Sequence, residues 1–177
     1  MKKNIISLFV LLLATSISEK VYSQEAVKPR PSPMAVATMK YEDTYIKVTY
    51  CRPHKKGREI FGGLEQFGKV WRTGANEATE ITFTKGIKFG GKALAAGTYS
   101  LFTIPNEKSW IVILNSELGQ WGAYNYDESK DVLRVETSVG KTDTSYEPFT
   151  IEFKQNDQGA DLVMMWDMTM IRIPIAF

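Results

Sequence analysis

The most constraining feature of the sequence is a series of short runs in which apolar and polar residues alternate, separated by Gly, Asn and Asp. Phe149, Ile151 and Phe153, for example, alternate with polar residues, and residues 45–52 and 80–85 show the same pattern. Side chains of a β-strand point to opposite faces with a period of two, so each run predicts a strand with one buried face. No long window carries a helical stripe, and the pattern therefore indicates an all-β fold.

Two further runs, residues 99–104 and 110–114, are apolar on both faces for much of their length. This is typical of central strands that are covered on two sides. Gly90-Gly91 lies between two three-residue runs and predicts a two-residue hairpin. Many short strands joined at hairpin spacing indicate a single antiparallel β-sandwich or flattened barrel.

The N-terminus has the pattern of a signal peptide. Lys2 and Lys3 precede an almost wholly apolar run, residues 5–14, and small residues at the end of the segment predict cleavage after Ser23. The apolar run is shorter than the roughly twenty residues that a membrane-spanning helix needs. We therefore expect a cleaved signal and not a membrane anchor.

This pattern divides the chain into three parts: the signal peptide, residues 1–23; a leader, residues 24–37; and the β domain, residues 38–177. Three closely spaced prolines predict that the leader is stiff and extended. No later stretch is long and apolar enough for a membrane helix, so we expect no integral membrane segment after cleavage. The expected location is the periplasm, the cell surface or the medium.

The net charge excludes one class of partner. The whole chain has 22 Lys and Arg against 20 Asp and Glu, but removal of residues 1–23 takes away three lysines and one glutamate. The remaining 19 basic and 19 acidic side chains balance. General attraction to nucleic acid therefore has no support, and we expect no nucleic-acid partner.

The cysteine and histidine content limits the available chemistry. Cys51 is the only cysteine, so an intramolecular disulfide is impossible, and we expect its thiol to be buried. His54 is the only histidine, which excludes multi-histidine zinc sites. Pro53 interrupts the strand between these two residues, which argues against a thiol–imidazole catalytic pair. With no nucleotide-binding fingerprint either, we expect no metal and no cofactor.

The segment of residues 50–76 is the most unusual part of the chain, because it is rich in arginine and lysine. The alternation of the strand places Arg52 on the same face as Ile46, Val48 and Tyr50, which we expect to point inward. On that face its guanidinium needs an anionic or carbonyl partner, or it must lie at an opening of the fold. We predict a site for a small anionic or sugar-like ligand at one end of the fold, lined by Arg52, Arg58, Trp71, Arg72 and Asn76. The alternative, which the sequence leaves open, is that these arginines tie a long loop to backbone carbonyls and acids.

A second cluster combines aromatic and amide side chains. Its members are Trp110, Trp121, Tyr124, Tyr126, Asn115 and Asn125. These are the usual materials of a sugar-binding surface and equally of a β core and its covering loop. The sequence does not separate the two interpretations.

Several motifs together carry a resemblance to a known family. They are Tyr50-Cys51-Arg52-Pro53, residues 56–62 (KGREIFG), 70–76 (VWRTGAN), 97–105 (GTYSLFTIP) and 121–124 (WGAY). In this order they resemble an exported bacterial family known as domain of unknown function 2911, over about residues 32–175. The resemblance implies an exported domain of that extent and no established activity. Cys51 stands where the family pattern has a serine, which weakens a catalytic role for the thiol.

Three functions are consistent with these features. The first is an exported, non-catalytic binding domain that uses the arginine and tryptophan cluster. The second is an envelope hydrolase or lyase with a general acid or base from Glu59, Glu77, His54 or a tyrosine. The third is a structural or partner-binding subunit of an envelope complex, with a partner that the sequence does not identify.

Overall fold

The computed structural model describes residues 28–177. The expected signal peptide and the first residues of the expected leader lie outside this part of the chain. The strands are β1 (Met34–Tyr41), β2 (Thr44–Cys51), β3 (Thr79–Phe83), β4 (Ile87–Phe89), β5 (Lys92–Leu94), β6 (Gly97–Ile104), β7 (Ser109–Asn115), β8 (Asp131–Asn156) and β9 (Gly159–Ala176), with one 3₁₀ turn, η1 (Glu128–Lys130). Within residues 28–177, no helix has the length and apolar character of a membrane-spanning segment.

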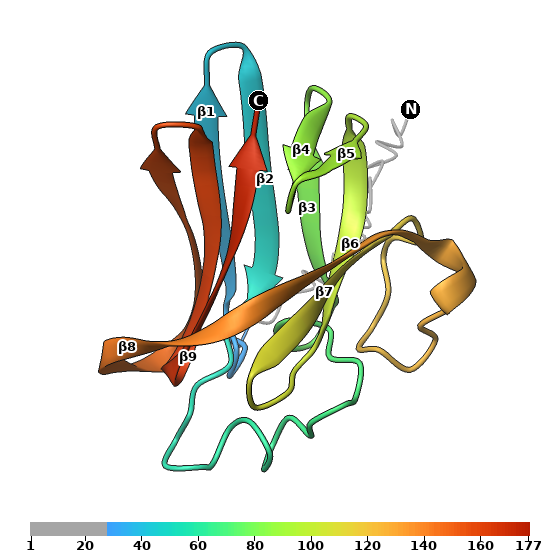
Figure 1. The fold of residues 1–177 in the computed structure, drawn as a ribbon. Helices are drawn as coiled ribbons and strands as arrows, with labels where there is room; N and C mark the ends of the chain where they lie inside the picture. Colours follow the sequence, from blue (N-terminus) through green and yellow to red (C-terminus); the bar gives the residue numbers. More distant parts are fainter. Residues whose placement is uncertain (1–27) are drawn as a thin grey trace, which may run out of the picture.

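The strands form one continuous antiparallel sheet in the order β1-β2-β3-β6-β7-β8-β9-β4-β5 (Figure 1). β8 carries the chain from one half of this sheet to the other, because residues 131–138 pair with β7 and later residues pair with β9. Register shifts on either side of Tyr146 interrupt the second ladder, and such irregularities bend a strand. The predicted single antiparallel all-β domain is confirmed.

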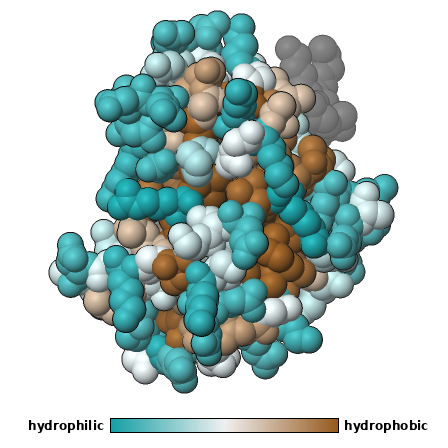
Figure 2. Space-filling model, in the orientation of Figure 1, coloured by the Kyte–Doolittle hydropathy of each residue, from teal (hydrophilic) through white to brown (hydrophobic). Residues whose placement is uncertain are grey.

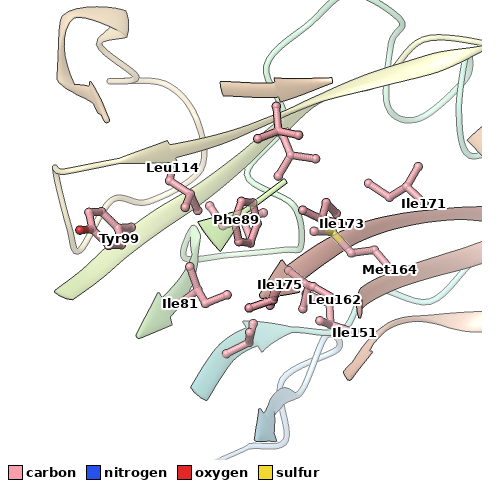
Figure 3. Packing of buried hydrophobic residues seen from close by; sticks show 14 of the residues in the cluster. Ile81, Phe89, Tyr99, Leu114, Ile151, Leu162, Met164, Ile171, Ile173 and Ile175 are labelled. Carbon is pink, nitrogen blue, oxygen red and sulfur yellow. The ribbon is translucent and has the colours of Figure 1, made fainter. Parts of the chain in front are cut away.

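The two halves of the sheet face each other across one hydrophobic core. Phe83 of β3 and Phe89 of β4 meet edge to face, with ring centroids 6.0 Å apart. Figure 3 shows Ile81 on one side of Phe89 and Leu162 and Ile173 of β9 on the other. In the view of Figure 2, hydrophobic residues occupy the middle of the face and hydrophilic residues its margins. The core therefore lies between two layers, as in a sandwich.

Burial along the strands follows the alternation of the sequence. In β2, Ile46, Val48 and Tyr50 are buried, while Tyr45 and Lys47 are exposed. β6 and β7 are buried on both faces, as their continuous apolar runs predict, because a second small cluster around Phe102 and Ile113 covers their outer side.

The hairpin predicted at Gly90-Gly91 is present and joins β4 to β5, with Phe89 opposite Lys92. Both glycines have positive φ, 57° and 79°, which is the backbone that a two-residue hairpin of this type requires. A Cβ at Gly90 would also clash with Val135 of β8. Sequence and packing therefore both demand glycine at this position.

β1 begins at Met34, inside the segment expected to be leader, and pairs along its whole length with β2. It lies at the end of the strand order, and none of its residues is fully buried. An edge strand of this kind has a weak hydrophobic pattern, and for this reason the sequence alone does not mark where β1 begins.

The loop between β2 and β3, residues 52–78, crosses one end of the sandwich (Figure 1). An aromatic cluster fastens it to the core. Trp71 stacks on Trp166 of β9 with centroids 5.8 Å apart, and it meets Phe149 at 5.0 Å. Phe61, also from the loop, meets Trp110 of β7 at 4.6 Å. Contacts between aromatic rings add to the free energy gained by burying them.

We expect Trp71→Ala to lower the free energy of unfolding by about 3–5 kcal/mol, as is usual when a large aromatic is removed from a core. Tyr124→Ala, at a side chain that is 84% exposed, is the control and should change it by less than about 0.5 kcal/mol. Chemical denaturation measures both. Similar small losses for the two variants would contradict the anchoring role of Trp71.

Candidate functional site

The loop of residues 52–78 is held rigidly against the bulged part of β8 and β9. The backbone N–H of Lys55 donates to the Glu147 carbonyl at 2.8 Å. The side chain of Lys55 pairs with Asp167 at 2.7 Å, and the Lys56 N–H donates to the Glu147 carboxylate at 2.8 Å. Residues on this loop are therefore presented by a fixed platform.

Two of the arginines predicted to bind a ligand are paired within the protein. Arg52 donates from Nε to the Phe149 carbonyl at 3.1 Å and from Nη2 to the Thr150 hydroxyl at 2.8 Å. Arg58 donates from Nε to the Lys55 carbonyl at 2.9 Å and from Nη2 to the His54 carbonyl. These two arginines hold the loop, which is the alternative that the sequence left open.

Trp71 lies in the core and not on a surface. Only 3% of it is exposed, and its Nε1–H donates to the Gly74 carbonyl at 3.1 Å. Its backbone forms an isolated antiparallel bridge with Thr103 of β6. Neighbouring residues of an extended segment point to opposite sides, so the inward position of Trp71 directs Arg72 outward.

The structure brings Arg72 and Asn76 together with the second sequence cluster. A hollow of about 230 Å³ is lined by Arg72, Asn76, Trp121, Gly122 and Tyr124. Trp121 is 59% exposed and Tyr124 is 84% exposed. The hollow is thus walled by two aromatic side chains and contains one guanidinium and one amide.

Backbone hydrogen bonds fix the two segments that form the hollow. The Gly122 N–H donates to the Asn76 carbonyl at 2.9 Å, and the Ala78 N–H donates to the Gln120 carbonyl at 2.8 Å. Gly122 has a φ of 71°, and a Cβ at this residue would lie 2.7 Å from the Tyr124 ring. Glycine at this position therefore lets the aromatic ring pack closely against the chain.

The guanidinium of Arg72 differs from those of the loop arginines. Its Nε–H is buried and has no hydrogen-bond partner within residues 28–177. None of the ion pairs between the described residues includes it. A buried donor without a partner is costly and calls for an explanation, such as water or a ligand.

Glu65, on the same loop, has a strongly perturbed carboxyl group. Burial raises its pKa to about 7, while the positive charges of Arg72 and Arg58 act in the opposite direction. Glu77, named above as a possible acid or base, has its pKa lowered, chiefly by hydrogen bonds from Arg30 at 2.7 and 2.8 Å. Glu65 does not line the hollow, so the perturbed carboxyl and the hollow are separate features.

Cys51 is 1% exposed, and its Sγ–H donates to the Glu77 carboxylate at 3.5 Å. The observed partner of the thiol is thus a carboxylate and not His54. Within residues 28–177, no group of three or more His, Cys, Asp and Glu side chains is placed to hold a metal ion. Met164 and Met165 are buried and fill space in the core.

These observations define an all-β domain with a rigid end loop and a surface hollow of arginine, asparagine and aromatic residues. The chain belongs to the family described as protein of unknown function (DUF2911), whose model matches residues 32–175. No curated protein and no solved structure matches the chain.

The predicted site residues therefore occupy three environments. Arg52 and Arg58 bind protein carbonyls, Trp71 is in the core, and Arg72 and Asn76 line the hollow. The aromatic walls came from a segment about 45 residues further along the chain, and the isolated bridge between Glu77 and Trp121 joins the two segments. Glu65 was not among the expected acid or base residues, because its burial is a tertiary property.

The raised pKa of Glu65 predicts a pH-dependent stability. Between its usual pKa and about 7 the folded protein binds more protons than the unfolded chain, so this group makes stability fall as pH rises through that range. Glu65→Gln should therefore stabilise the protein by about 1–2 kcal/mol at pH 8, after allowance for solvent screening, and change little at pH 4. Thermal unfolding at both pH values measures this, and equal effects at the two would contradict the assignment.

Proposed function

We propose that this chain is an exported, non-catalytic binding domain, and that the hollow around Arg72 holds a small anionic or sugar-like ligand. Export rests on the signal-peptide pattern of residues 1–23. The binding role rests on the hollow, and above all on the guanidinium of Arg72, which forms no ion pair within residues 28–177 and whose Nε–H has no partner there.

The comparison among the arginines carries the proposal. Arg52 and Arg58 each donate two hydrogen bonds to protein oxygens. Arg72 sits on the same rigid platform, yet its buried Nε–H has no partner within residues 28–177. A guanidinium presents donors in a planar fork that matches a carboxylate or phosphate. The terminal nitrogens of Arg72 are not among the buried atoms, and an anion in the hollow would accept hydrogen bonds from them.

The lining of the hollow favours binding over hydrolysis. It contains no carboxylate and no imidazole, which are the commonest general acids and bases. The carboxyl whose pKa is raised to about 7 among the described residues, that of Glu65, is not part of it.

Thermal unfolding tests the proposal directly. We expect sulfate, phosphate, acetate or glucose to raise the melting temperature of the protein if one of them fits the hollow, because a ligand of the native state stabilises it by mass action. Arg72→Gln should abolish the shift and leave the fold intact. Arg172→Gln, at an exposed arginine of β9 outside this loop, is the matched control and should keep it. A shift that survives Arg72→Gln would place the ligand elsewhere.

Binding of an anion at Arg72 should also take up protons. Arg72 lowers the pKa of Glu65, and an anion that neutralises Arg72 weakens this effect, so the pKa rises and Glu65 gains a proton near pH 7. By linkage, affinity increases as pH falls through about 7. Calorimetry with sulfate or acetate in two buffers of different ionisation enthalpy measures the uptake. Glu65→Gln should abolish it without abolishing binding, and uptake that persists would contradict the coupling.

A further inference from the structure

We infer that the ligand of the hollow is an acidic saccharide, a single sugar ring that carries a carboxylate. This inference rests on the proposed function and narrows it to one substrate class. It combines the charge of the hollow with the nature of its walls.

The charge of the lining fits a monoanion. Arg72 is the only charged side chain among Arg72, Asn76, Trp121, Gly122 and Tyr124. One guanidinium binds one carboxylate through two parallel hydrogen bonds, here from the two terminal nitrogens, which are not buried as Nε is. A phosphate dianion would bring a second negative charge that no other lining residue neutralises.

The walls fit a sugar ring. Trp121 and Tyr124 leave 59% and 84% of their surface exposed beside the guanidinium. Each is a flat apolar ring that carries one polar group. The C–H face of a pyranose can pack on such a ring while the sugar hydroxyls remain hydrated. A simple carboxylate such as acetate would use Arg72 and leave both rings uncovered.

The amide of Asn76 and the size of the hollow are also consistent with a single sugar ring. The amide of Asn76 supplies donors and an acceptor. Within the described residues its N–H₂ makes one long hydrogen bond, 3.4 Å, to the Ser32 carbonyl. The volume of about 230 Å³ equals that of about eight liquid waters at about 30 Å³ each. This is room for one sugar ring within the hollow.

Three probes separate the contributions: glucuronate carries the ring and the carboxylate, acetate only the carboxylate, and glucose only the ring. We expect the purified protein to bind glucuronate about tenfold or more tightly than either of the others, as one aromatic packing contact implies. Titration followed by NMR measures affinities in the millimolar range. Trp121→Ala should remove the advantage over acetate and leave acetate binding unchanged. Tyr45→Ala, at an exposed ring on β2, is the control.

The outcomes distinguish this inference from the proposed function. Equal affinities for glucuronate and acetate would contradict the inference that the ligand is a saccharide, and so would tighter binding of glucuronate that persists in Trp121→Ala. Either result would still be consistent with an anion site at Arg72. Glucose binding as tight as glucuronate would overturn the need for the carboxylate. If none of the probes binds, or if Arg72→Gln leaves glucuronate binding unchanged, the inference and the anion site at Arg72 both fail.

Discussion

The stacking of Trp71 on Trp166 is the contact on which the functional end of this protein depends. It fastens a loop of residues 52–78 to the core and fixes which side of that loop faces inward. Because Trp71 is extended where it bridges Thr103, its neighbour Arg72 must point away from the core. A hydrophobic contact thus sets the position of a charged group, and the hollow around Arg72 is a consequence of how the core is packed.

The arginines of this loop show why residue type alone does not define a site. Arg52 and Arg58 have the same planar set of donors as Arg72. Arg52, however, donates to a carbonyl and a hydroxyl of β8, and Arg58 donates to two carbonyls of the loop. Hydrogen bonds of this kind stabilise a long loop whose backbone groups would otherwise lack partners. Arg72 differs in its surroundings. Its segment is held to residues 120–122 by backbone hydrogen bonds, and its buried Nε–H has no hydrogen-bond partner within residues 28–177.

Electrostatics link this site to Glu65 without placing Glu65 in it. The carboxyl has a pKa of about 7 because it is largely buried, and Arg72 is one of the charges that restrain the rise. A carboxyl in this state resembles those that enzymes use as general acids, but here it does not line the hollow. The same raised pKa makes the protonation of Glu65 sensitive to the charge of Arg72, and the proposed pH dependence of binding rests on this coupling.

The sequence by itself determined the fold class, the central strands and the Gly90 hairpin, because alternation and turn chemistry are local properties of the chain. It also marked Arg72, Asn76, Trp121 and Tyr124 as unusual, in two separate clusters. It did not determine the start of β1, whose edge position leaves it without buried residues, nor which arginines are paired. Only the tertiary structure decided that Trp71 is core, that Glu65 is partly buried and that residues 72 and 121 share one hollow. Burial and pairing depend on contacts between segments distant in the chain, and no local pattern encodes them.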